Sequence, residues 1–280
     1  MKLLRVGEKG KEIPAILDEN NKLRDISSHI KDLNPDFLNF ETLSKLKNLD
    51  LAKLSEIPNS VRIGACINKP GKFVAIGLNY SDHAKETGAK VPAEPIVFMK
   101  ATSSISGPND DIVKAKDSKK LDWEVELAFV VGKDSKNISE KEAPNHILGY
   151  CIVNDISERE WQIEKMGQWV KGKSGDTFGP TGPYLVTKDE ISNINSLNLI
   201  SEVNEKRMQS GNTKNMIFNT NFLLSYLSKF MSLQPGDIVT TGTPAGVGMG
   251  MKPPVFLNTG DKIKLSIDNL GEQNSKVITE

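Results

Sequence analysis

The segment from Asp122 to Val131 constrains the fold of this chain more than any other stretch. Its side chains alternate between two faces, with Val125, Leu127, Phe129 and Val131 on one face and Glu124, Glu126, Ala128 and Val130 on the other. A period of two residues is typical of a β-strand, and we expect the uniformly apolar face to be buried. Further short apolar runs cover residues 73–76, 147–153, 237–241 and 263–267. The sequence therefore predicts a β-rich α+β fold.

Residues that interrupt secondary structure divide the chain into two regions of different character. Residues 1–65 combine short strand-like runs with a Leu-rich, helix-like segment, and Pro58-Asn59-Ser60 interrupts the pattern. We predict a small N-terminal α/β cap over residues 1–65 and a catalytic domain over residues 70–280. One further helix is expected at 218–230, where apolar residues recur with helical spacing and indicate core packing.

Composition excludes several classes of protein. The 280 residues are 38% hydrophobic and 26% charged, which is typical of a folded chain. The 36 basic residues equal the 36 acidic ones, so neither a nucleic-acid partner nor a membrane surface is expected. Two cysteines are too few for a disulfide framework. No apolar run approaches the length of a membrane span, and we predict a cytoplasmic protein.

Three carboxylates form a candidate metal site. Glu124 and Glu126 point to the same side of their strand, and Asp155 directly follows the apolar run 147–153. Two like charges beside a core are costly unless a cation lies between them, although a solvated strand face would also explain the pair. Asp155 could instead cap a helix at residues 156–159. An all-oxygen site suits Mg²⁺ or Mn²⁺, and the scattered histidines and cysteines argue against zinc.

A histidine and a glutamate are spaced for contact. His83 and Glu86 lie three residues apart in a segment that predicts one helical turn, ended by Gly88. A carboxylate beside an imidazole raises its basicity, as a general base requires. An ordinary surface pair has the same spacing, so the spacing leaves both interpretations open.

Two glycine-rich loops could contact an anionic substrate. Residues 171–183 carry Lys173, and the resemblance of Gly172-Lys173-Ser174 to a phosphate loop is discounted because no predicted strand precedes it. Residues 240–248 place Thr243 among glycines whose amides could approach a carboxylate. A solvated lysine and an ordinary connection remain alternatives for these loops.

Eight stretches taken together resemble the fumarylacetoacetate hydrolase family. They run in one order from about residue 73 to the C-terminus: GLNYSDHAKETG, PIVFMKATSSISGP, LDWEVELAFVVGK, GYCIVNDISERE, GQWVKGKSGDTFGPTGP, NTKNMIF, LQPGDIVTTGTPAGVG and FLNTGDKIKLSI. The resemblance implies a β-sandwich roll, a homodimer and a site at the open end of the roll. Val203-Asn204-Glu205-Lys206 departs from the family's usual Val-Asn-Gly-Glu turn.

The resemblance also implies roles for particular residues. Glu124, Glu126 and Asp155 would hold Mg²⁺ or Mn²⁺. His83, Glu86 and Lys173 would be catalytic, and Thr243, Lys100 and Gln162 would contact substrate.

The expected reaction is hydrolytic C–C cleavage of an acylpyruvate or another 2,4-diketo acid, through a metal-stabilised enolate. Ureidoglycolate cleavage is the main alternative, and isomerisation, hydration or decarboxylation of 2-oxo-dioic acids would use the same site. A binding module that has lost its chemistry is a non-enzymatic alternative. It would need neither the base nor the lysine.

Overall fold

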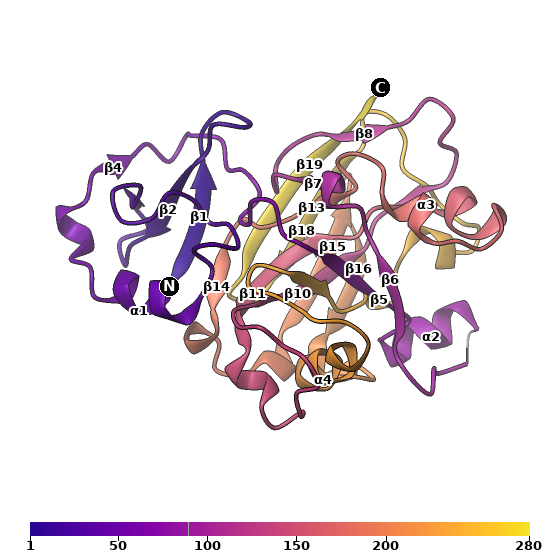
Figure 1. Cartoon of the computed structure of the whole chain (residues 1–280). Helices are drawn as coiled ribbons and strands as arrows, with labels where there is room; N and C mark the ends of the chain where they lie inside the picture. The colour runs from indigo at the N-terminus through magenta and orange to yellow at the C-terminus, as the bar shows by residue number, and fades with distance from the viewer. Residues whose placement is uncertain (89) are drawn as a thin grey trace.

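Two sheets dominate the computed structural model, which describes residues 1–88 and 90–280 (Figure 1). The larger sheet has ten strands, in the spatial order β4 (Glu56–Ile57), β3 (Leu23–Asp25), β2 (Ile13–Leu17), β1 (Lys2–Val6), β14 (Leu185–Thr187), β11 (Ile147–Asn154), β10 (Val125–Val131), β17 (Ile238–Thr240), β5 (Phe73–Gly77) and β6 (Ile96–Met99). The smaller sheet has five, in the order β16 (Lys206–Asn212), β15 (Asn198–Val203), β18 (Lys262–Ile267), β19 (Gly271–Thr279) and β8 (Ile112–Lys114).

Short elements connect these strands. Two small pairs join β12 (Ser157–Glu158) to β9 (Leu121–Asp122) and β13 (Gly179–Pro180) to β7 (Ile105–Ser106). The α-helices of the described residues are α1 (Phe40–Lys47), α2 (Ser81–Thr87), α3 (Val170–Lys173) and α4 (Thr220–Phe230). None of the helices in the described part of the chain is long and apolar enough to cross a membrane.

The expected β-rich α+β fold is confirmed, because sheet far outweighs helix. The buried apolar core between the two sheets includes Leu127 and Phe129 from β10 and Leu199 and Leu265 from the smaller sheet. The sandwich therefore forms around the apolar face that the alternation identified.

The other face of β10 is buried as well, which corrects the expectation that only one face would be. Ala128 and Val130 pack in a second core with Leu38, Leu43 and Leu46 of the N-terminal segment. A strand that is packed on both sides carries apolar residues on both faces. The second core does not include Glu124 and Glu126, which instead line a cavity.

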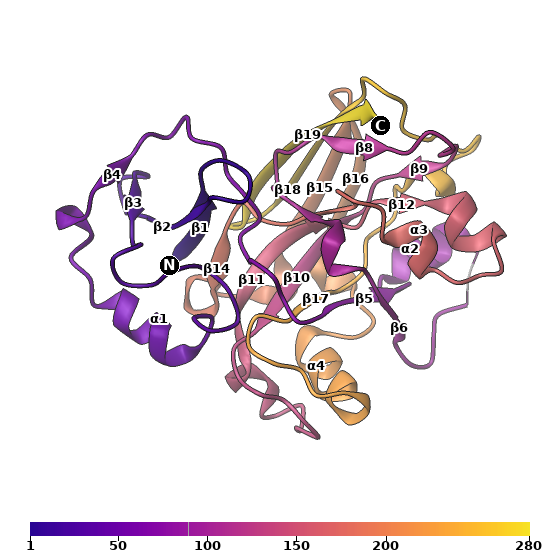
Figure 2. The same ribbon diagram turned by 45° about the horizontal axis from the view of Figure 1, so that its top comes forward.

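The N-terminal segment lies to one side of the sandwich, beyond β14 and away from α2 and α3 (Figure 2). Its strand β1 pairs antiparallel with β14, so the larger sheet runs on into this segment. The boundary at residue 65 stays a prediction.

Two local expectations were wrong in detail. Lys173 ends the short helix α3 rather than lying in a long loop. The aromatic side chains of α4 do not form a core stripe: Phe222 stacks between Phe218 and Tyr226, and Phe230 at the end of the row is 61% exposed. Leu223 and Leu227 of the expected core-facing side are buried, together with Leu224, and they anchor the helix.

Candidate active site

The pairing of β10 with β11 brings the three predicted carboxylates together. Glu126 lies opposite Val153 in the antiparallel register, and the amide of Asp155 donates to the carbonyl of Glu124 at 3.0 Å. One oxygen from each of Glu124, Glu126 and Asp155 lies within 4.8 Å of the others, and all three side chains are buried. Asp155 precedes no helix at residues 156–159, so it does not act as a cap there.

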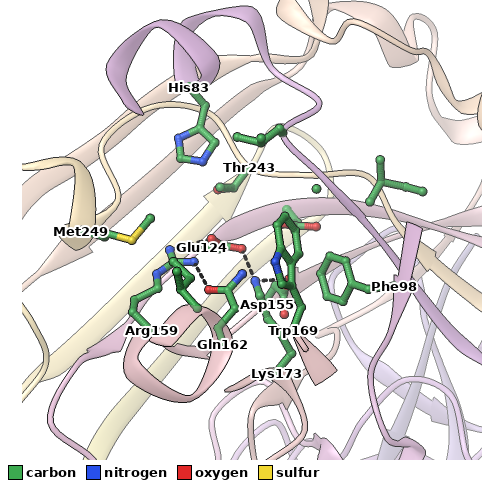
Figure 3. Close-up of a pocket in the computed structure, with 15 residues that line it drawn as sticks. His83, Phe98, Glu124, Asp155, Arg159, Gln162, Trp169, Lys173, Thr243 and Met249 are labelled. Carbon is green, nitrogen blue, oxygen red and sulfur yellow. Dashed lines mark hydrogen bonds and ion pairs between the residues drawn. The ribbon is translucent and has the colours of Figure 1, made fainter. Parts of the chain in front are cut away.

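Two lysines and an arginine surround these carboxylates (Figure 3). The Nζ of Lys173 donates to Glu124 at 2.7 Å and to Asp155 at 2.6 Å. The Nζ of Lys100 donates to the other oxygen of Asp155 and to the carbonyl of Lys173. Arg159 donates from Nη2 to Glu124 at 2.6 Å. Buried charges are tolerated when they are paired and hydrogen-bonded in this way.

The two glutamates respond to these surroundings in opposite directions. Burial opposes ionisation of Glu124, but the positive charges of Lys173 and Arg159 outweigh it and lower its pKa well below the usual range. Burial, with the negative charges of Asp155 and Glu124, raises the pKa of Glu126 well above its ordinary value. Among the described residues Glu126 forms no salt bridge; it accepts hydrogen bonds from Thr240 and from the amide of Gly242.

The donor set fits a divalent cation. Three buried carboxylates converge, and the Lys173 ammonium that bridges two of them shows that a positive charge is stabilised there. Hard cations such as Mg²⁺ and Mn²⁺ prefer carboxylate oxygens. The chemistry of the residues therefore supports a divalent metal without distinguishing between these two.

Arg159 is a site residue that the sequence reasoning missed. Its three donating nitrogens reach Asp122, Gln162 and Glu124 at 2.8, 3.0 and 2.6 Å. Gln162 lies in a π-helical turn, Glu160–Glu164, and lines the cavity as predicted. The available signal was an arginine four residues after Asp155, but exposed arginines are too common for that spacing to be decisive.

His83 and Glu86 lie on one face of α2, as their spacing predicted. The Nδ1 of His83 is 3.2 Å from an oxygen of Glu86, whose other oxygen accepts from the amide of Gly246 at 2.9 Å. His83 lines the cavity and is only 6% exposed. The carboxylate thus fixes the orientation of the imidazole and joins α2 to the loop after β17.

Thr243 and Lys100 differ in their access to the cavity. Thr243 lines it and donates its hydroxyl proton to the carbonyl of Val125 at 2.9 Å. Lys100 is not among the lining residues of the described chain, since it lies behind Asp155. Its use as a substrate contact stays a prediction.

One cavity of about 200 Å³ contains these groups. Its charged floor is formed by Glu124, Glu126, Asp155, Arg159 and Lys173, and the imidazole of His83 reaches it from the opposite side (Figure 3). Three converging carboxyl groups, a fixed imidazole and a buried ammonium around one cavity can bind an oxygen-rich anion and move a proton next to it.

Comparison with known proteins identifies the family. The family model described as fumarylacetoacetate (FAA) hydrolase C-terminal matches residues 72–278. The chain belongs to the fumarylacetoacetate hydrolase family. The suspected resemblance and the fold that it implied are thereby confirmed.

Relatives of known sequence extend over nearly the whole chain. A protein of Burkholderia ambifaria and one of Burkholderia multivorans are each 55% identical over 274 residues, covering 98% of this chain and 97% of the relative. Their names class them provisionally as hydrolases and specify no substrate.

Solved structures of the family have the same fold. A fumarylacetoacetate hydrolase from Exiguobacterium antarcticum is 34% identical, with a TM-score of 0.90 and full coverage of both chains. A probable 2-hydroxyhepta-2,4-diene-1,7-dioate isomerase from Mycobacterium abscessus is 32% identical, with a TM-score of 0.85 and coverage of 100% and 99%. A maleylpyruvate hydrolase from Sphingobium, in complex with manganese(II) and pyruvate, is 27% identical, with a TM-score of 0.83 and the same coverage.

Proposed function

We propose that this protein is a divalent-metal-dependent hydrolase that cleaves a C–C bond in an acylpyruvate, that is, a 2,4-dioxo acid. The convergence of the carboxylate triad, Lys173 and the His83–Glu86 pair on one cavity carries the proposal. The manganese and pyruvate named for the Sphingobium enzyme support it, because pyruvate is the product that an acylpyruvate would yield.

Glu124, Glu126 and Asp155 would hold the cation. The chemistry that a divalent cation supplies at such a site is Lewis acidity toward the oxygens of a 2-oxo acid. Lys173 adds a positive charge next to the same oxygens once it exchanges part of its contact with Glu124 and Asp155. The positive charges of the cation and Lys173 would together stabilise the enolate, in which negative charge has moved onto the 2-oxo group.

His83 acts as the general base. Its Nδ1 faces Glu86, so Nε2 takes the proton from water. The water oxygen bonds to C4 of the substrate, the C3–C4 bond breaks, and its electron pair remains on the three-carbon fragment as an enolate. A proton on C3 then completes pyruvate, and the other fragment leaves as a carboxylic acid. Thr243 lines the cavity from the loop after β17 and would hold the C1 carboxylate by exchanging its hydrogen bond to the carbonyl of Val125 for one to the substrate.

Metal removal tests the whole proposal. Dialysis against a chelator should abolish cleavage of 2,4-dioxo acids, and added Mg²⁺ or Mn²⁺ should restore it. Full activity in metal-free protein would contradict the assignment of the triad.

Substitution of the base tests the role of α2. His83→Ala should lower kcat by about 10²-fold or more, because proton transfer is lost. His29→Ala is the matched control, since His29 is exposed and distant in sequence from every lining residue. Equal rates in the two variants would remove His83 from the mechanism.

Isomerisation is a second candidate, because a solved neighbour at 32% identity is named as a dioate isomerase. Product analysis separates the two: hydrolysis gives two fragments, whereas isomerisation conserves the mass of the substrate. Ureidoglycolate cleavage stays an untested alternative. We also propose a homodimer, as the resemblance implied, and light scattering on the purified protein tests it.

A further inference from the structure

The lining residues of the cavity divide sharply by exposure. Every charged lining residue of the described chain is buried, and so are Gln162 and Thr243. The lining residues that reach solvent are all apolar: Leu78, Phe98, Ile163, Trp169 and Met249. We call these five residues the mouth ring. A substrate whose carboxylate end binds on the charged floor therefore has its other end at an apolar opening.

The aromatic part of the mouth ring is held in place by close packing. The rings of Phe98 and Trp169 meet edge to face, with centroids 5.3 Å apart and planes at 64°. Trp169 also lies against Gly77 at the end of β5, where an added Cβ would come within 2.4 Å of the indole. Only glycine permits this approach, so the indole has a fixed seat in the wall (Figure 3).

No lysine or arginine belongs to the mouth ring, and the basic side chains below it already have carboxylate partners. Lys173 contacts Glu124 and Asp155, and Arg159 contacts Asp122 and Glu124. A second carboxylate at the far end of a substrate would lose water to an apolar surface without gaining a counter-ion. Such desolvation is unfavourable for an anion and favourable for an uncharged group.

The small size of the cavity also favours a short substrate. Its volume of about 200 Å³ lies below the usual range for pockets that enclose drug-sized ligands. The dioate and maleyl compounds named for two solved neighbours carry a second carboxylate. The mouth ring of this chain has no feature that would pair with such a group.

We infer that the enzyme selects acylpyruvates whose acyl group is short and uncharged, and that the mouth ring rejects substrates with a distal carboxylate. This inference rests on the proposed function and adds the class of substrate. The selection arises from the absence of a counter-ion at the mouth, so a single added cation there should relax it.

A matched pair of substrates measures the selection. The compounds 2,4-dioxoheptanoate and 2,4-dioxoheptanedioate share one carbon skeleton and differ only by a methyl or a carboxylate at C7. With one water, the first yields pyruvate and butanoate and the second yields pyruvate and succinate. We expect kcat/KM of the metal-loaded enzyme to favour the monoacid by about tenfold or more.

A cation introduced at the mouth should shift the preference. Ile163→Arg places a guanidinium at a lining position that is 47% exposed, and should raise kcat/KM for the dioate so that the ratio falls at least fivefold. Met249→Lys tests the same idea from another segment of the mouth ring, should the first variant fold poorly. Val170→Arg is the control, because Val170 is 42% exposed but does not line the cavity. Assays at about 0.15 M salt limit long-range attraction to about 8 Å.

The outcomes distinguish the inference from the proposed function. A wild-type enzyme that cleaves the dioate as fast as the monoacid, or a control that shifts the ratio as much as Ile163→Arg, overturns the inference and leaves the hydrolase assignment intact. Cleavage of neither compound, with or without Mg²⁺ and Mn²⁺, overturns the proposed function and the inference with it.

Discussion

Two clusters of charged side chains lie in hollows of this molecule, and they are built differently. The catalytic cluster surrounds Glu124, Glu126 and Asp155. The second cluster joins the N-terminal segment to the sandwich, where Arg5 contacts Glu12 and Asp32 and Arg62 contacts Glu12 and Asp110. The second hollow is the larger, at about 450 Å³ against about 200 Å³. Volume alone therefore does not indicate where chemistry occurs.

Charge pairing separates the two clusters. In the second cluster each of the three carboxylates meets a guanidinium. Burial opposes ionisation of Glu12 and Asp110. The pKa values of both nevertheless lie below their ordinary range, chiefly because each carboxylate accepts a hydrogen bond from Arg62. Glu126 in the catalytic cluster forms no salt bridge among the described residues. Burial and the charges of Asp155 and Glu124 outweigh the nearby charge of Lys173 and raise the pKa of Glu126. The carboxyl without an ion-pair partner thus lies where we propose that a ligand binds, whereas the paired carboxylates hold segments together.

The largest expected effect comes from neutralising Glu126. Glu126→Gln keeps the size of the side chain and its contact with Gly242, but removes a proposed cation ligand, so kcat should fall by about 10²-fold or more. Calorimetry should show weaker Mg²⁺ binding. The unfolding free energy of the metal-free protein should be unchanged or higher, because the variant removes a buried carboxyl whose ionisation the folded state opposes.

Glu12→Gln is the counterpart in the second cluster. It should lower the urea midpoint and leave kcat and metal affinity unchanged, because Glu12 links Arg5 and Arg62 away from the cavity. A loss of stability in Glu126→Gln that matches the loss in Glu12→Gln would break the distinction between the clusters.

A cation removed from the second cluster should cost stability alone. Arg5→Met leaves Asp32 without its guanidinium and breaks the contact of Arg5 with the carbonyl of Ala65. We expect a loss of about 3–5 kcal/mol in unfolding free energy, since Arg5 is only 6% exposed. Urea unfolding and steady-state kinetics on the same preparation check both halves of this prediction. A large fall in kcat would contradict a purely structural role.

The pH dependence of stability sharpens the contrast further. Because the folded pKa values of Glu12 and Asp110 lie below 4.5 and 3.8, their ion pairs stabilise the fold above this range and lose that effect as the pH falls through the folded values. The difference in urea midpoint between the wild type and Arg62→Met should be constant from neutral pH down to about pH 5 and shrink below it. A difference that grew on acidification would have the wrong sign.

The smallest effect is expected at an exposed pair. Lys47 of α1 contacts Asp189 near β14 at 2.8 Å, with side chains 64% and 45% exposed. Water and salt screen such a pair, so Lys47→Ala should leave the urea midpoint within experimental error. A loss as large as that of Arg5→Met would mean that burial does not govern the strength of these contacts.

Local patterns in the sequence predicted much of the site. The two-residue period placed Glu124 and Glu126 on one side of β10, and the three-residue spacing joined His83 to Glu86, because strand and helix geometry are set by neighbours in the chain. The role of Arg159 could not be predicted in this way. Its partners Asp122 and Glu124 lie 37 and 35 residues away in the chain, beyond the reach of any local period, although Gln162 is three residues away.

By itself, the sequence determined that β10 and several other strands form, which face of β10 enters the sandwich and which residue types could hold a cation. Only the tertiary structure decided that β10 is covered on both sides, that Lys173 of α3 and Lys100 just after β6 both meet Asp155, and that the mouth of the cavity is apolar. The reason is physical. Periodicity fixes the direction of a side chain relative to its own backbone, but the charge or surface that it meets depends on contacts between segments far apart in the chain.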